Sequence, residues 1–156
     1  MGTGTGPGTR LIDMQLGPLV VVRRDATLMD AAQAMMRTGV SAVIVGDRDT
    51  IVTERDLVDA LARGRPSVDH ALNAATVNPW SIHASETVLD ALTAMVRHGV
   101  RHLVVLDQAG DPVGVAALAA TAEAALGDTD VPHWLTGFRL ALHRETSRHD
   151  VGLFET

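Results

Sequence analysis

The chain of 156 residues contains no cysteine, no lysine and no tyrosine. Without cysteine it has no disulfide framework, no thiolate metal site and no cysteine nucleophile. Aromatic residues make up only 3% of the chain, so valine, leucine, alanine and methionine must fill its core. No apolar run approaches the roughly 18 residues of a membrane-spanning helix, and residues 1–10 lack the apolar core of a signal peptide. These absences predict a cytoplasmic protein that does not bind a membrane.

Positive charge is also scarce. All 13 basic residues are arginines, against 19 acidic residues, and the formal net charge is −6. A general nucleic-acid binder would show a basic face instead, so we expect no nucleic-acid partner. Apolar residues make up 46% of the sequence, enough for one domain or for two small halves that share a core.

The chain contains an internal repeat. The stretch "DATLMDAAQAMMRTGVSAVIVGD" (25–47) aligns with "SETVLDALTAMVRHGVRHLVVLD" (85–107) at a constant offset of 60 residues. Each copy begins with a helical pattern that ends at a glycine, Gly39 or Gly99, and continues into a short apolar strand. The buried helix faces are predicted to comprise Leu28, Ala31, Ala32, Met35 and Met36 in the first copy, and Val88, Ala91, Leu92, Met95 and Val96 in the second.

Further strands are predicted at 19–22, 50–52, 79–82 and 112–116, with a second helix after the last strand of each copy. Each unit therefore reads β-α-β-β-α. We predict an α+β fold of two pseudo-symmetric units packed through their sheets, because a half of about 60 residues buries too little surface alone. The predicted boundaries are a disordered leader at 1–10, units at 11–66 and 67–126, and a tail at 127–156.

Three stretches place threonine and aspartate three residues apart at a helix start: Thr27–Asp30, Thr53–Asp56 and Thr87–Asp90. That spacing is typical of a capping box, in which each side chain accepts a hydrogen bond from the other residue's backbone N–H. In "TIVTERDL" (50–57) the pair follows a strand, and there it has a second interpretation as a ligand contact.

The order, spacing and duplication of these motifs resemble the cystathionine-β-synthase (CBS) domain, which occurs as tandem pairs. The resemblance covers about residues 11–126. It implies a regulatory module that binds adenine nucleotides or S-adenosylmethionine in clefts between the units and dimerises through its helices. The ligand would be AMP, ADP, ATP, NADH or S-adenosylmethionine, with no cofactor required and no metal site.

The same resemblance implies which residues meet the ligand. Thr53 and Asp56 stand where the family contacts ribose, and a carboxylate can accept hydrogen bonds from both ribose hydroxyls. Arg101 and His102 stand where basic residues meet phosphates, opposite Ser41 and Ala42; a solvated strand end is the other interpretation of Arg101. The positions that line the adenine map to Val52, Thr76, Ser81 and Val100.

The second copy departs from this pattern, because Ala117 and Ala120 stand at the threonine and aspartate positions. The expected outcome is one intact site per chain. The alternative is a dimerisation scaffold that has lost ligand binding. No nucleophile elbow, phosphate-cradling loop or metal cluster is present, so we predict no catalytic residues and no enzyme.

Two assembly surfaces are predicted. The helix after each unit's last strand carries apolar residues suited to a homodimer: Leu57, Val58 and Leu61 in the first unit, and Leu118, Ala122 and Ala125 in the second. In the tail, Trp134, Phe138 and Leu142 recur every four residues, which predicts an amphipathic helix that packs on the module or on its dimer partner, or docks an unidentified protein.

Overall fold

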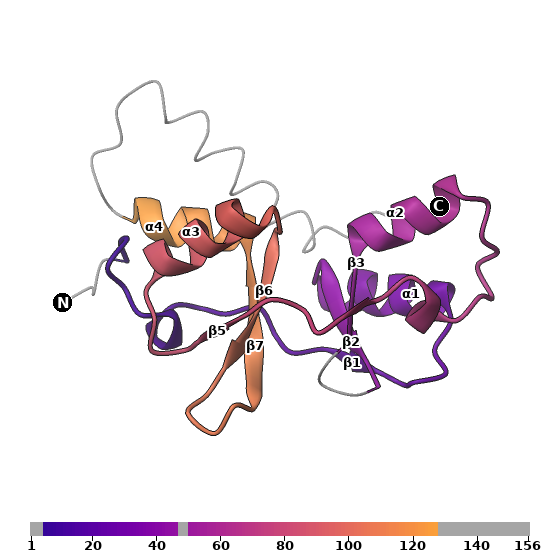
Figure 1. Cartoon of the computed structure of the whole chain (residues 1–156), viewed down its shortest axis with the longest axis horizontal. Coiled ribbons are helices and arrows are strands. Elements are labelled where there is room, and N and C mark those ends of the chain that lie inside the picture. The colour runs from indigo at the N-terminus through magenta and orange to yellow at the C-terminus, as the bar shows by residue number, and fades with distance from the viewer. Residues whose placement is uncertain (1–4, 47–49, 128–156) are drawn as a thin grey trace. The chain divides into compact units, whose positions relative to one another are not determined.

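The computed structural model describes residues 5–46 and 50–127. These residues form four α-helices and seven strands in two sheets, which confirms the predicted α+β fold class (Figure 1). The chain divides into two compact units. The first-repeat unit is Pro18–Trp80, and the second-repeat unit joins residues 5–17 to residues 81–127. The predicted tail helix lies outside the described residues.

The first-repeat unit is a four-stranded sheet with two helices. Its strands lie in the order β1 (Val21–Val22), β2 (Ala42–Val45), β3 (Thr50–Thr53) and β4 (Thr76–Val77). β1 and β2 are parallel and are joined by α1 (Leu28–Thr38), whereas β3 is antiparallel to both of its neighbours and leads into α2 (Glu54–Ala62). The core consists of Ala31, Ala34, Met35, Val40, Val43, Val45, Val52 and Ala71.

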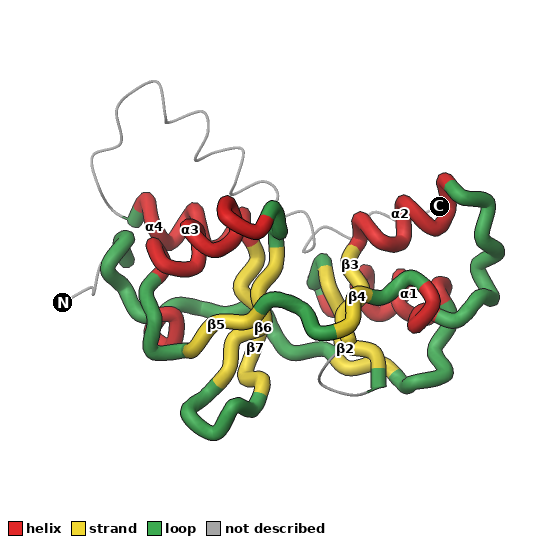
Figure 2. Tube along the Cα trace, viewed as in Figure 1, coloured by secondary structure: helices red, strands yellow, loops and turns green. Residues whose placement is uncertain are grey.

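The second-repeat unit repeats this plan with three strands. β5 (Ser81–His83) is parallel to β6 (His102–Leu106), and β7 (Pro112–Ala117) is antiparallel to β6. The helices α3 (Val88–His98) and α4 (Leu118–Leu126) lie side by side (Figure 2). The core consists of Leu11, Met14, Ile82, Ala84, Val88, Ala91, Met95, Leu103, Val105 and Ala116.

The ends of α1 and α3 follow the sequence prediction. The capping boxes of Thr27–Asp30 and Thr87–Asp90 are both complete. Gly39 and Gly99 end the two helices in the left-handed conformation, with φ of 70° and 64°. A glycine adopts this conformation without the steric cost that a Cβ would add.

One part of the predicted helix faces is wrong in the same way in both repeats. Met36 and Val96 were expected to be buried, but their side chains are 59% and 81% exposed. At about 100° per residue, each lies about 80° around the helix from the first residue of the buried stripe. Both side chains therefore fall beyond the edge of the face that packs on the sheet.

A feature absent from the predictions is a pair of equivalent extended segments. We call residues 7–17 the N-terminal strap and residues 67–77 the middle strap. The N–H groups of Val88 and Leu89 donate to the carbonyls of Thr9 (2.8 Å) and Pro7 (3.0 Å). In the other unit, Leu28 and Met29 donate in the same way to Asp69 (2.8 Å) and Ser67 (3.0 Å) of the middle strap. Each strap thus covers the first turn of a repeat's first helix.

Each strap packs in the unit of the other repeat, not in the unit of the repeat that comes next in the chain. The N-terminal strap precedes the first repeat but belongs to the second-repeat unit, and the middle strap precedes the second repeat but belongs to the first-repeat unit. Each contains one 3₁₀ turn, η1 (Leu11–Asp13) or η2 (Ala71–Asn73). The predicted boundaries at 11–66 and 67–126 follow sequence order, whereas the compact units exchange these two segments. Residues 7–10 of the predicted leader are part of the strap.

Candidate ligand site

The junction between β3 and α2 holds the threonine and aspartate singled out in the sequence. The Thr53 N–H and the Thr53 hydroxyl both donate to Oδ2 of Asp56, each over 2.8 Å. The Asp56 N–H donates to the Thr53 hydroxyl over 3.3 Å. The capping box predicted from the spacing is therefore confirmed.

The box leaves one carboxylate oxygen available. Among the described residues, Oδ1 of Asp56 has no hydrogen-bond partner, because both donors from Thr53 go to Oδ2. Asp56 is half-buried, whereas Asp30 and Asp90, the acidic members of the other two boxes, are exposed. The Thr53 hydroxyl donates its one proton to Asp56, so toward a ligand it can act only as an acceptor. Both side chains can thus accept a hydrogen bond from a hydroxyl group, and the charged Asp56 carboxylate is the stronger acceptor.

The start of β2 lies at the same end of the sheet. Ala42 pairs with Thr53 across the ladder, and the Glu54 N–H donates to the Ser41 carbonyl over 3.0 Å. Ser41, Ala42, Thr53 and Asp56 therefore lie together at one end of the first-repeat sheet.

The two other predicted positions of the first-repeat unit differ from each other. Val52 is fully buried in the core of the first-repeat unit, so neither its side chain nor its backbone is exposed in this unit. Thr76 is exposed on β4, where it pairs with Ile51 of β3.

The second-repeat unit has the same junction without the polar pair. His102 pairs with Ala117, and the Leu118 N–H donates to the Arg101 carbonyl over 2.8 Å. These contacts match those of Ala42 and Ser41 in the first-repeat unit. Ala117 is the N-cap of α4 and provides no side-chain hydrogen bond. Ala117 therefore occupies the position in the second-repeat unit that Thr53 occupies in the first, as the sequence alignment of the repeats indicates.

The remaining predicted residues also lie in the second-repeat unit. Arg101 is exposed and His102 is half-buried. Val100 precedes them and donates its N–H to the Met95 carbonyl over 3.0 Å. Ser81 is exposed on β5 and pairs with Val104 of β6.

The sequence of this chain was compared with known protein families and solved structures. The sequence matches the family described as "CBS domain" over residues 13–63 and again over residues 72–119, which together make up most of the chain. The chain belongs to the CBS domain family. The two matched segments correspond to the two repeats, so the protein is a CBS pair.

Solved structures share this fold. A CBS domain protein from Pyrobaculum aerophilum, complexed with AMP, is 22% identical, with a TM-score of 0.66; the match covers 85% of this chain and 98% of that one. The CBS domain pair of protein MJ0100, in complex with 5′-methylthioadenosine and S-adenosyl-L-methionine, is 20% identical, with a TM-score of 0.66 and coverage of 74% and 94%.

A sequence relative comes from Acidianus ambivalens. This protein, described as an uncharacterized 17.7 kDa protein in the bps2 3′ region, is 27% identical over 122 residues, which cover 76% of this chain and 74% of the relative.

Within residues 5–46 and 50–127, no helix of this CBS pair is long and apolar enough to cross a membrane. The same residues contain no cluster of three or more histidine, aspartate or glutamate side chains that could hold a metal ion.

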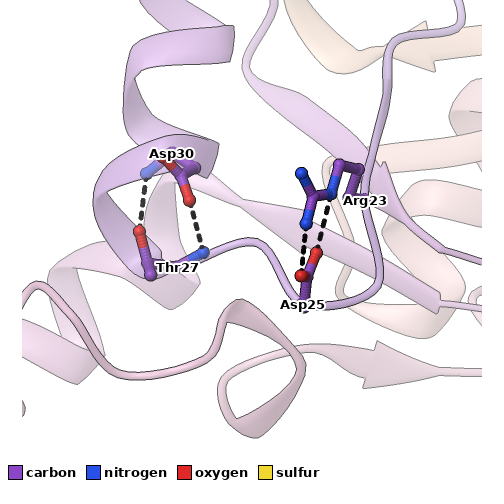
Figure 3. A network of polar contacts seen from close by, with 4 residues as sticks. All are labelled: Arg23, Asp25, Thr27 and Asp30. Atoms are coloured by element: carbon purple, nitrogen blue, oxygen red, sulfur yellow. Dashed lines mark hydrogen bonds and ion pairs between the residues drawn. The ribbon is translucent and has the colours of Figure 1, made fainter.

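A second polar cluster in the first-repeat unit was not singled out in the sequence (Figure 3). Arg23 and Asp25 face each other after β1 and form an ion pair, close to the capping box of Thr27 and Asp30. The residues that surround this pair, Gly46, His70 and Leu72, are distant from it in the sequence. Only the fold could show that they border a hollow.

Proposed function

We propose that this CBS pair is a regulatory protein that binds an adenosyl ligand and that Asp56 holds the ribose. The observation that carries the proposal is the half-buried Asp56 carboxylate, which has one oxygen engaged in the capping box and the other without a partner among the described residues. Two adjacent hydroxyl groups, as on ribose, suit such an acceptor. The adenosyl ligands bound by the Pyrobaculum protein and by MJ0100 support this ligand class.

The decisive experiment compares Asp56→Ala with Asp30→Ala and Asp90→Ala by calorimetry with AMP, ADP, ATP, NADH and S-adenosylmethionine. All three variants lose a capping box and should lose about 0.5–2 kcal/mol of stability. Only Asp56→Ala should also lose about 2–4 kcal/mol of binding, or roughly 30- to 1000-fold in affinity. Unchanged affinity in a folded Asp56→Ala protein would leave Asp56 with the capping role alone.

We propose that Arg101 meets the phosphate of a nucleotide ligand, aided by His102. Arg101 is exposed and its guanidinium can bind a phosphate through two parallel hydrogen bonds. Arg101→Ala is therefore expected to weaken AMP far more than adenosine. Equal losses for AMP and adenosine would assign Arg101 to a solvated strand end.

A scaffold without ligand binding is the second candidate, and the bare N-terminus of α4 favours it. With Ala117 and Ala120, the start of α4 has no polar side chain at the positions that Thr53 and Asp56 occupy in the first-repeat unit. Thermal shifts with the same five ligands separate the candidates, because a ligand at 100 times its dissociation constant stabilises the native state by about 2.7 kcal/mol. No shift with any of the five would favour the scaffold.

We also propose that the scaffold or sensor assembles as a homodimer through its helices. Met29 and Met36 on α1 and Leu89 and Val96 on α3 occupy equivalent positions and are exposed. On α2, Val58 and Leu61 are 64% and 67% exposed. Apolar side chains grouped on the outer faces of helices are typical of a surface that another chain covers.

A further inference from the structure

The first-repeat unit contains an open hollow of about 780 Å³. Val21, Val22 and Gly46 place it at the carboxyl ends of the parallel strands β1 and β2. Its volume falls within the range of small-molecule sites, and the carboxyl ends of parallel strands are where such ligands commonly bind. The hollow is distinct from the Asp56 junction, because β2 begins near Ser41 and ends at Val45.

The lining combines an apolar floor with mainly basic side chains. Val21, Val22 and Leu72 supply the apolar part, and the polar part consists of Arg23, Arg24, Asp25 and His70. A neighbouring hollow of about 520 Å³ shares Val21, Val22, Arg23 and Asp25 and adds Arg37 and Asp30. The basic groups stand out in a chain whose net charge is −6.

The Arg23–Asp25 pair shows what this hollow can recognise. Nε of Arg23 donates to Oδ1 of Asp25 over 2.9 Å and a terminal guanidinium nitrogen donates to Oδ2, so the carboxylate occupies the guanidinium fork with both oxygens (Figure 3). The hydrogen bonds from Arg23 lower the pKa of Asp25. The two side chains are 84% and 60% exposed, and an exposed pair of this kind is weakly held. Another oxyanion can therefore take the place of Asp25 at little cost.

We propose that this hollow binds a small organic anion, with a phosphate or carboxylate group in the Arg23 fork and an apolar or ring-shaped body against Val21, Val22 and Leu72. Arg24 adds positive charge around the same hollow, and His70 adds an imidazole that can form hydrogen bonds. Asp25 acts as an internal competitor that fills the fork when no ligand is present.

The second repeat does not duplicate this chemistry. At the 60-residue offset, His83, Ala84 and Ser85 stand where the first repeat has Arg23, Arg24 and Asp25. Ala84 is buried in the core of the second-repeat unit, and neither alanine nor serine can form an ion pair. The anion site therefore belongs to the first repeat alone, independently of the adenosyl site.

Nuclear magnetic resonance titration of the full chain tests the proposal with three probes: phenyl phosphate, benzoate and the neutral benzyl alcohol. We expect an anionic probe to shift the amide signals of Val21, Val22 and Gly46, and benzyl alcohol to leave them unchanged. Phenyl phosphate alone would identify a phosphate site, and benzoate alone a carboxylate site. Asp56→Ala should bind the probes like the parent protein, which separates this test from that of the adenosyl site.

Two substitutions then act in opposite directions. Arg23→Gln should weaken the anionic probe about two- to fivefold, because it removes an exposed bidentate donor. Asp25→Asn should strengthen it about two- to fivefold, because it removes the competing carboxylate. Arg63→Gln is the matched control, since Arg63 forms a similar exposed ion pair with Asp59 on α2 and should have no effect.

Three results would overturn the proposal. They are the absence of localised shifts with either anion, equal shifts with benzyl alcohol, and an affinity that Arg23→Gln and Arg63→Gln change alike.

Discussion

Three aspartates in this chain form the same hydrogen-bonded box at a helix start, yet their surroundings differ. Asp30 and Asp90 cap α1 and α3 on the surface, whereas Asp56 caps α2 in a half-buried position beside the start of β2. The spacing of threonine and aspartate predicts the cap in all three cases, because the box is a local interaction within four residues. It does not predict burial, which depends on the strands that pack around each helix start.

The two exposed caps make stability sensitive to acid. Hydrogen bonds from the backbone of Thr27 and Thr87 lower the pKa of Asp30 and Asp90 below the ordinary value of an aspartate. A carboxylate whose folded pKa is lowered stabilises the native state above its unfolded pKa, near 4, and this contribution is lost as the pH falls through the folded pKa. Urea unfolding at a series of pH values should therefore show a smaller loss of stability between neutral and strongly acidic pH for Asp30→Asn/Asp90→Asn than for the parent protein. An equal loss of unfolding free energy at acidic pH in the variant and in the parent protein would contradict this prediction.

The element scale shows where sequence patterns are informative. Helical periodicity and the glycines at their ends predict α1 and α3 closely, because a capping box and a left-handed glycine act through local contacts. Sequence patterns do not predict the two straps, because these segments are short, mostly irregular and held by backbone hydrogen bonds. Residues 7–10 read as part of a glycine-rich leader for this reason. The hollow at Arg23 could not be predicted from the sequence either, because Gly46 and His70 come from segments that are distant in the chain.

The N-terminal strap should be essential to the second-repeat unit. Leu11 is completely buried in that core, whereas the next residue, Ile12, is 54% exposed. Leu11→Ala is expected to cost about 2–5 kcal/mol of stability, and Ile12→Ala about 0.5 kcal/mol or less. Equal costs would mean that the strap contributes little to the core.

Hydrogen exchange of the Leu11→Ala variant locates the loss. The amides of Val88 and Leu89, which donate to the N-terminal strap, should exchange faster. The amides of Leu28 and Met29, which donate to the middle strap, serve as the internal control. A rate increase confined to Leu28 and Met29 would contradict the assignment of the strap to the second-repeat unit.

The uncapped start of α4 offers a gain of stability. Ala117→Thr with Ala120→Asp would install the box that α2 already has, and a new N-cap is worth about 0.5–2 kcal/mol. Urea unfolding should show this increase, and a variant no more stable than the parent would show that the junction cannot accommodate the box. Ligand titration of the same variant reports whether a second adenosyl site has been restored.

At the scale of the whole molecule, duplication has produced two units with different surfaces. The exposed apolar positions of α1 and α3 are kept in both repeats, but the helices after the last strand have diverged. Val58 and Leu61 of α2 are exposed, whereas Leu118 and Ala125 of α4 pack partly against their own core. Of the two helices predicted from the sequence to carry the dimer interface, α2 thus offers more apolar surface than α4.

Light scattering at micromolar concentration tests the proposed dimer. We expect about twice the chain mass of 16.5 kDa, because a two-fold interface covers the same patch on both chains at once. A charge placed in that patch would be buried beside the same charge of the partner chain, so Leu61→Glu should shift the protein toward the monomer. Val68 is similarly exposed in the loop after α2, and Val68→Glu should leave the dimer unchanged.

Equilibrium titration of the dimer should then give one adenosyl ligand per chain, since only the first repeat has a polar pair at its junction. A parent protein of monomeric mass would remove the dimer, and two equivalent sites per chain would show that Ala117 and Ala120 do not prevent binding.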